Sequence, residues 1–289
     1  MPFNWKTFQT RTLTAIIFAA VMLTGLLWNH WSFLVLFSII HFGCWWEYFN
    51  LLEKIQNRSY HLIVRFGFML LGFSIILVFC GKSFTIMGYN IRENFLIPIS
   101  LAGIILLSIG IFQSRQINLQ LFGKVVLGLV YVSLSLGLMI YLRQEGMSFK
   151  GGYLFFDFGR VYPCLIIFSI WINDTMAYIF GSIFGKTPLS IISPKKTWEG
   201  TIGGIILSVV IIGLLGSYLI GTTLLIAAVV ALLSSIFGTI GDLFESKLKR
   251  MANVKDSGSF MPGHGGFLDR FDSMLFAIPA VWIFVYLMI

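Results

Sequence analysis

Acidic side chains recur at helical spacing near the C-terminal end of the chain. Glu245 and Ser246 follow Asp242 by three and four positions, and Asp272 follows Asp269 by three. Residues at these separations share one face of a helix. Asp242 ends one apolar segment and Asp269 begins the next, so antiparallel helices would bring both carboxylates to one depth. Clustered carboxylates suit Mg²⁺, which keeps positions for phosphates. The spacing therefore predicts a cluster of carboxylates around Asp242 and Asp269 that suits Mg²⁺.

Two further carboxylates are candidate ligands or orienting groups. Asp174 lies within the apolar run 161–180, where a carboxylate costs about 2.5–3.5 kcal/mol on membrane-insertion scales. A buried Asp paired with Lys or Ser to lock two helices is the structural alternative, but ionisable residues in such segments are functional by default. Asp256 lies in the polar connection that follows Asp242.

Basic side chains accompany the carboxylates in two polar connections, and their charge suits phosphate groups. They are Lys186, Lys195, Lys196, Lys249, Arg250, Lys255 and Arg270. Basic clusters beside a membrane also attract anionic head groups, by about 1 kcal/mol per residue, and for 247–250 the two interpretations stand about even. Lys195 and Lys196 are held between Pro194 and a helix start. An anchoring patch does not need that arrangement, so a substrate contact is favoured there.

A glycine-rich turn at 263–266 contains His264. Glycines let backbone amides approach an anion closely, and an imidazole can donate a hydrogen bond or relay a proton. A tight start to a helix is the alternative interpretation, and the flanking charges favour a phosphate loop.

The composition predicts an all-α, polytopic membrane protein. Hydrophobic residues make up 57% of the 289 and charged residues 11%, against about 25% charged in soluble domains. Backbone amides in lipid must be satisfied within a helix. We expect about nine spans and one membrane domain over 1–289, with N-terminal spans over about 1–160 and catalytic spans over 161–289. The expected spans are 12–28, 31–51, 62–80, 95–113, 119–142, 161–180, 201–220, 222–242 and 270–289. The three cysteines share no ligand spacing and are expected to be inert packing residues.

The distribution of basic residues predicts the orientation. With the N-terminus in the cytoplasm, 15 of the 20 Lys and Arg lie on the cytoplasmic side, the flank that basic residues favour. We therefore expect an N-in, C-out topology with both polar connections, and the site that they form, in the cytoplasm.

The charged segments together resemble the signature of the phosphatidate cytidylyltransferase, or CDP-diacylglycerol synthase, family. The resemblance covers about 170–275 and is carried by Ser246-Lys-Leu-Lys-Arg, Lys255-Asp-Ser-Gly, Pro262-Gly-His-Gly-Gly-Phe-Leu-Asp-Arg-Phe-Asp and Ser193-Pro-Lys-Lys-Thr-Trp-Glu-Gly. The first 160 residues agree only in their apolar spans and loosely in Trp46-Glu47-Tyr48.

The resemblance implies a nucleotidyltransferase of phospholipid biosynthesis that transfers CMP from CTP to phosphatidate, releasing pyrophosphate. It implies a homodimer in the inner or plasma membrane, in contact with membrane lipid. Mg²⁺ is the implied cofactor, with K⁺ as a second cation. The implied catalytic residues are Asp242, Asp269, Lys255, His264 and Arg270, and Asp242 and Asp269 would hold metal. The implied substrate-binding residues are Lys186, Ser193, Lys195, Lys196, Thr197, Lys249, Arg250, Gly265 and Gly266.

Two other functions stay open at this point. A CTP-dependent lipid-alcohol kinase would share the membrane helices and the nucleotide but would release CDP. A secondary transporter would also carry charges within its spans, but here the carboxylates gather at the boundary and no internal repeat is visible. No nucleic-acid partner is expected.

Overall fold

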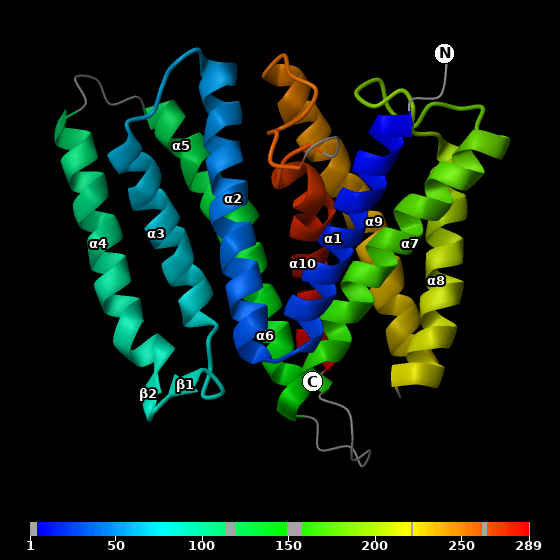
Figure 1. Ribbon diagram of the computed structural model, residues 1–289, viewed down its shortest axis with the longest axis horizontal. Helices are drawn as coiled ribbons and strands as arrows, with labels where there is room; N and C mark the ends of the chain where they lie inside the picture. Colours follow the sequence, from blue (N-terminus) through cyan, green and yellow to red (C-terminus); the bar gives the residue numbers. More distant parts are fainter. Residues whose placement is uncertain (1–4, 114–118, 149–157, 221, 262–264, 289) are drawn as a thin grey trace. The chain divides into compact units, whose positions relative to one another are not determined.

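The computed structural model of the chain describes residues 5–113, 119–148, 158–220, 222–261 and 265–288. The α-helices are α1 (Trp5–Leu27), α2 (His30–Gln56), α3 (Leu62–Val78), α4 (Ile91–Gln113), α5 (Leu119–Gly128), α6 (Ser135–Ser148), α7 (Val161–Phe184), α8 (Trp198–Ile220), α9 (Leu224–Met251) and α10 (Leu268–Met288) (Figure 1). A π-helical turn, Leu129–Leu134, joins α5 to α6, and a 3₁₀ turn, Phe158–Arg160, precedes α7. The chain divides into two compact units, residues 1–140 with 248–271 and residues 141–247 with 272–289.

The all-α prediction is confirmed for the described residues. Seven helices there are long and apolar enough to cross a membrane, and two apolar segments, Thr12–Leu27 and Leu62–Val78, are shorter. The one strand pair in the described ranges is a hairpin, β1 (Thr85–Ile86) with β2 (Tyr89–Asn90), which the sequence did not predict. Its two-residue turn has positive φ at Met87 and Gly88, the backbone that a tight hairpin requires.

In the first unit, α2 packs against α3, α5 and the π turn, and α3 lies along α4 (Figure 1). Helix α2 is buried along most of its length, and Trp45 is completely covered. The hydroxyl oxygen of Ser133 in the π turn lies 3.0 Å from His41 Nε2 and accepts a 2.8 Å bond from Trp45 Nε1. These bonds satisfy polar atoms that would otherwise be buried without a partner. His41 is therefore a residue of the core.

In the second unit, α7 and α8 run side by side along their lengths (Figure 1). A Cβ at Gly200 would lie 2.7 Å from the Ala177 carbonyl oxygen, and one at Gly204 would lie 2.8 Å from that of Asn173. Only glycine permits this approach, as is common where helices pack in lipid. The close contact at Gly200 and Gly204 therefore depends on glycine. It anchors the start of α8, and with it the Lys195–Lys196 segment, against α7.

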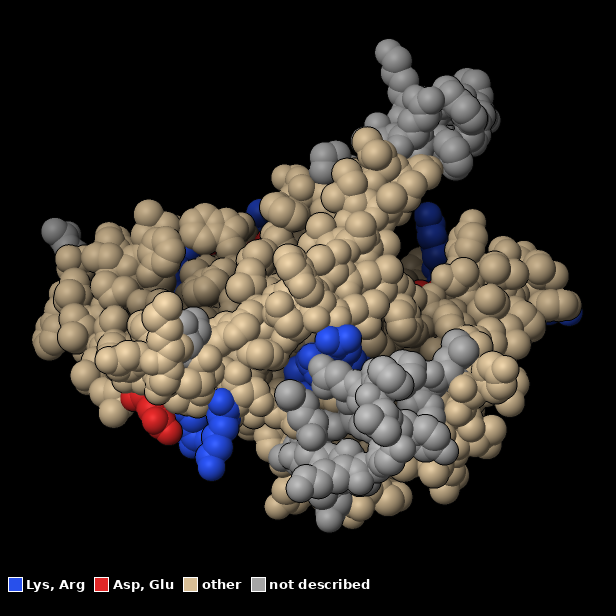
Figure 2. Space-filling model, turned by 60° about the horizontal axis from the view of Figure 1, so that its bottom comes forward, with Lys and Arg blue, Asp and Glu red and all other residues tan. Residues whose placement is uncertain are grey.

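Large apolar side chains cover much of the surface. Phe112 is 88% exposed, Leu225 is 68% exposed and Ile97 is 65% exposed. Figure 2 shows one face on which uncharged residues predominate and the few charged side chains gather at separate places. Cys44, Cys80 and Cys164 are buried free thiols, as expected for packing residues. A surface of this kind suits lipid rather than water.

Candidate active site

Three carboxylates come together in the second unit. Asp242 and Glu245 on α9 and Asp272 on α10 each place a carboxylate oxygen within 4.8 Å of the others. Glu245 and Asp272 are buried, and Asp242 is partly exposed. The helices can approach closely because residue 241 is glycine, where a Cβ would lie 2.5 Å from the Asp272 carbonyl oxygen. The predicted shared face of Asp242 and Glu245 is confirmed.

This acidic group fits a hard divalent cation. Each residue supplies an oxygen ligand, and Mg²⁺ is bound by a few carboxylates while retaining positions for phosphate or water. Three carboxylates at such short range repel one another unless positive charge lies among them. Within the described part of this unit, the residues that could hold a metal are therefore Asp242, Glu245 and Asp272, and the last two extend the predicted ligand set.

Lys196 supplies positive charge to this group through an ion pair with Asp242. The preceding connection folds back on itself: Leu189 N–H donates to the Lys196 carbonyl at 2.7 Å, and Trp198 N–H donates to that of Thr187 at 3.0 Å. The Glu199 carboxylate accepts bonds from the backbone N–H groups of residues 186 and 187 at 3.1–3.2 Å. The segment that carries Lys196 is thus held at both ends.

The other predicted residues of this connection take different positions. Lys186 and Lys195 are exposed, and Ser193 is partly covered. Thr197 accepts a 3.2 Å bond from Gly200 N–H and so caps α8. Asp174 is exposed on α7, and Asn173 donates a 3.4 Å bond to its carboxylate. Among the residues that the structure describes, the acidic group of three does not include Asp174.

Asp269 lies in the first unit at the start of α10, and described residues donate hydrogen bonds to both of its carboxylate oxygens. Lys249 Nζ donates to Oδ1 at 2.6 Å. The backbone N–H of Ser257 donates to Oδ2 at 2.8 Å, and that of Gly266 donates to Oδ2 at 2.9 Å. The Ser257 hydroxyl lies 2.9 Å from the same oxygen. The carboxylate therefore organises the connection between α9 and α10, and its predicted role as a metal ligand shared with Asp242 stays a prediction.

A second carboxylate binds this connection, and it belongs to a residue that is distant in the sequence. Glu47 on α2 is 5% exposed, and its oxygens accept bonds from Ser257 Oγ at 2.7 Å and from Phe267 N–H and Leu268 N–H at 2.9 Å. Sequence reasoning missed this role. The available signals were an acidic residue in an apolar helix and the loose match at Trp46-Glu47-Tyr48.

The remaining predicted residues of the second connection are on the surface or outside the described ranges. Arg250, Lys255, Asp256 and Arg270 are exposed. His264 lies outside the described residues, so its role stays a prediction. Gly265 has a φ of +82°, a conformation that favours glycine.

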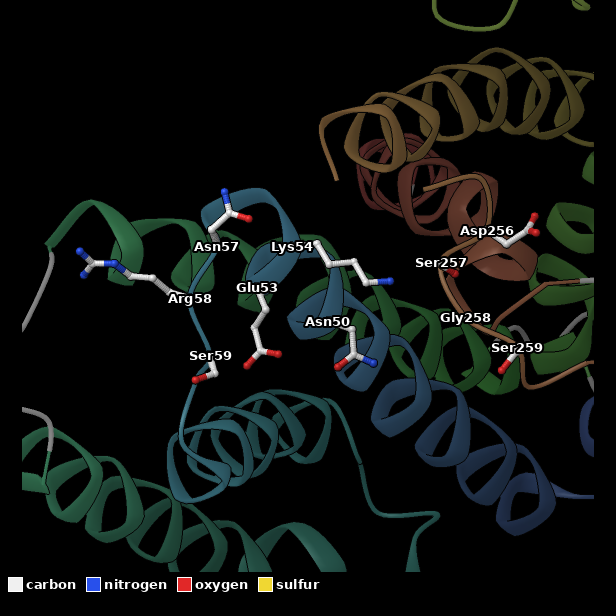
Figure 3. Close-up of a pocket in the computed structure, with 10 residues that line it drawn as sticks. All are labelled: Asn50, Glu53, Lys54, Asn57, Arg58, Ser59, Asp256, Ser257, Gly258 and Ser259. Carbon is white, nitrogen blue, oxygen red and sulfur yellow. The ribbon is translucent and has the colours of Figure 1, made fainter. Parts of the chain in front are cut away.

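A recess of about 620 Å³ adjoins the Asp256–Ser259 segment in the first unit (Figure 3). Lys54 extends from the end of α2 towards that segment, and Arg58 points away from it. The Glu53 side chain, which lines the recess, is held by an ion pair with Arg65 and by a hydrogen bond from Tyr60 N–H. Burial raises the pKa of the Tyr60 phenol. The recess is lined by both acidic and basic side chains, not by a cluster of one charge.

Comparison with known proteins places these motifs in a family. A profile of the cytidylyltransferase family matches residues 9–288. A protein of Staphylococcus saprophyticus named phosphatidate cytidylyltransferase is 31% identical over 94% of this chain and 96% of its own length. The same figures hold for a protein of that name from Staphylococcus aureus strain COL. Phosphatidate cytidylyltransferase 4, chloroplastic, of Arabidopsis thaliana is 38% identical over 59% of this chain and 46% of its own length. This chain therefore belongs to the cytidylyltransferase family.

Proposed function

We propose that this chain is a multi-pass membrane enzyme that transfers CMP from CTP to phosphatidate, forming CDP-diacylglycerol and pyrophosphate. The family match over nearly the whole chain supports the substrates. The observation that carries the chemistry is the acidic group Asp242, Glu245 and Asp272, with Lys196 bound to it. Hard oxygen ligands beside a lysine are what a polyphosphate reaction requires.

The reaction is an in-line displacement at the α-phosphorus of CTP. An oxygen of the phosphatidate phosphate forms the new bond to that phosphorus, and the bond to the oxygen that bridges to the β-phosphorus breaks. Pyrophosphate leaves with the electron pair. A phosphate monoester is already ionised at neutral pH, so no strong general base is needed. Catalysis of this kind is mainly positioning and charge neutralisation.

Magnesium, when bound, would neutralise charge on the phosphates. Asp242, Glu245 and Asp272 would hold it, and Asp269 is proposed as a further ligand with Asp174 and Asp256 as candidates. Potassium is the proposed second cation. Exchanging K⁺ for Na⁺ at constant ionic strength should lower turnover, and equal rates in the two salts would remove potassium from the proposal.

The lysines are proposed to bind phosphates, but two of them must first leave their ion pairs with carboxylates. Lys196 pairs with Asp242, and Lys249 pairs with Asp269. A phosphate that binds either ammonium would replace a carboxylate, and the freed carboxylate could then accept a cation. The exposed Lys186, Lys195 and Lys255 need no such exchange.

The proposed topology has nine spans, with the N-terminus and the site in the cytoplasm. The two shorter apolar helices, added to the seven long ones, give this number. A cytoplasmic site lets CTP arrive from water while the acyl chains of phosphatidate stay in lipid. Labelling of single cysteines at positions 54 and 92 from either side of sealed vesicles tests the orientation. We expect position 54 to react from the cytoplasmic side only and position 92 from the other.

The function is tested by following both ends of the nucleotide. Purified protein is incubated with phosphatidate, Mg²⁺ and CTP labelled at the α- or γ-phosphorus. Label from the α position should enter lipid, γ label should leave as pyrophosphate, and the two products should form in equal amounts. Transfer of γ label to lipid would establish a kinase instead.

A homodimer is also proposed, and a monomeric mass in detergent and in nanodiscs would contradict it.

A further inference from the structure

The connection between α9 and α10 contains more of the signature than any other segment, yet a residue of α2 lies at its centre. Three donors of this connection converge on Glu47: the Ser257 hydroxyl and the backbone N–H groups of Phe267 and Leu268. The first N–H groups of a helix have no partner within the helix. Glu47 supplies that partner for α10, and its negative charge suits the positive end of the helix dipole.

Two glycines of the connection, Gly258 and Gly266, are explained by the same carboxylate. A Cβ added at Gly258 or at Gly266 would overlap the Glu47 carboxylate. The sequence interpretation gave Gly266 to a phosphate. In the structure its missing side chain makes room for Glu47, and its N–H donates to Asp269 at 2.9 Å. The need for glycine at these two positions therefore follows from Glu47.

Ser257 joins Glu47 to Asp269. Its hydroxyl oxygen lies 2.7 Å from Glu47 Oε2 and 2.9 Å from Asp269 Oδ2. A serine hydroxyl has one proton and can donate to only one carboxylate at a time. The Ser257 backbone N–H donates to Asp269 as well, at 2.8 Å. Any displacement of Glu47 is thus transmitted to Asp269 through one residue and through the start of α10.

We propose that Glu47 is a positioning residue of the transfer reaction, which sets the place of Asp269 and the first turn of α10 without touching substrate. This inference rests on the proposed role of Asp269 in the reaction. It predicts that catalysis depends on a carboxylate in the N-terminal part of the chain, where the resemblance to the family is only loose.

Glu47→Gln is the decisive variant, because it keeps the shape and leaves one oxygen where two were used. Whichever way the amide turns, its NH₂ group faces a backbone N–H. Turnover per folded molecule should fall about 10- to 100-fold, since small misplacements at a reacting site have effects of this order. Ser133→Ala is the matched control, because it also removes a buried acceptor in the first unit but lies on the π turn. Its turnover per folded molecule should stay within about twofold.

A double-mutant cycle separates positioning from general loss of stability. Glu47→Gln combined with Ser257→Ala should be little worse than the poorer single variant, because the two residues act through one network. Glu47→Gln combined with Ser133→Ala should show the product of the two single effects. Multiplication of the effects in the first pair would overturn the proposal.

Hydrogen exchange provides a readout that does not depend on activity. The Phe267 and Leu268 amides should exchange at least about tenfold faster in Glu47→Gln and at the normal rate in Ser133→Ala. Unchanged exchange, or faster exchange with turnover within twofold of the unsubstituted protein, would overturn the proposal. If the unsubstituted protein transfers no α label, the proposed function fails, and exchange alone then decides whether Glu47 orders this segment.

Discussion

Asp269→Asn perturbs the proposed function at a residue whose contacts with Lys249, Ser257 and Gly266 are known. The substitution replaces one carboxylate oxygen with an NH₂ group. If the amide oxygen stays at the Oδ2 position, where Ser257 and Gly266 donate, the NH₂ group faces the ammonium of Lys249. That ammonium lies 2.6 Å from Oδ1 in the native pair. The new amide NH₂ group and the Lys249 ammonium, both hydrogen-bond donors, would then face each other in place of the ion pair.

The cost can be estimated from burial. The Asp269 side chain is 6% exposed and the Lys249 side chain is 14% exposed. Breaking a buried ion pair by removing one partner costs about 3–5 kcal/mol. Because the lysine retains some contact with solvent, we expect the lower end, about 3 kcal/mol. Turnover should fall by at least about 100-fold through the loss of the positioned carboxylate.

The structure changes the expectation for folding but not for activity. The sequence alone predicts a variant that is inactive and normally stable, whereas the ion pair predicts that stability also falls. Lys249→Met in the Asp269→Asn background removes the stranded charge and should recover most of that stability. It should not recover turnover. Thermal unfolding in detergent and α-label transfer measure the two quantities, and a double variant with restored turnover would refute this reasoning.

Three other outcomes follow from the second unit. Glu245→Gln should raise the Mg²⁺ concentration needed for half-maximal turnover at least about tenfold; a Mg²⁺ titration with an unchanged midpoint would remove it from the metal site. Gly204→Ala should lower stability by about 1–3 kcal/mol, because its Cβ would lie 2.8 Å from an α7 backbone oxygen. The control is Gly213→Ala, whose Cβ would lie 3.5 Å from its nearest neighbour. This control should have the same unfolding temperature as the unsubstituted protein. Glu199→Gln should speed tryptic cleavage after Lys186, and a native cleavage rate would show that its two backbone bonds do not hold the connection.

The spacing of apolar and charged residues in the sequence predicted the helices and the residues that share a helix face. Apolar runs placed the helices, and the three-residue spacing of Asp242 and Glu245 placed both on one face of α9. The sequence interpretation ended that segment at 242, but α9 continues to Met251. Charged residues favour helix as readily as apolar ones do, and the basic side chains in its last turn suit the helix dipole. Hydropathy detects the membrane boundary, not the end of the helix.

Long-range packing explains what the sequence could not predict. Asp272 joins Asp242 and Glu245 only because Gly241 lets two helices approach. Glu47 meets Ser257 across 210 positions of sequence, and neither residue has a local pattern that points to the other. Met87 adopts a positive φ in the hairpin turn, where the usual signal would be Asn, Asp or Gly.

Transfer of CMP to a lipid phosphate is proposed to depend on the carboxylates beside Lys196. Its most direct test is one assay that compares the purified protein with its Asp242→Asn variant, using phosphatidate, Mg²⁺ and CTP labelled at the α-phosphorus. We predict lipid-bound label with the unsubstituted protein and none above background with a folded variant. Equal labelling by the two proteins would contradict the account.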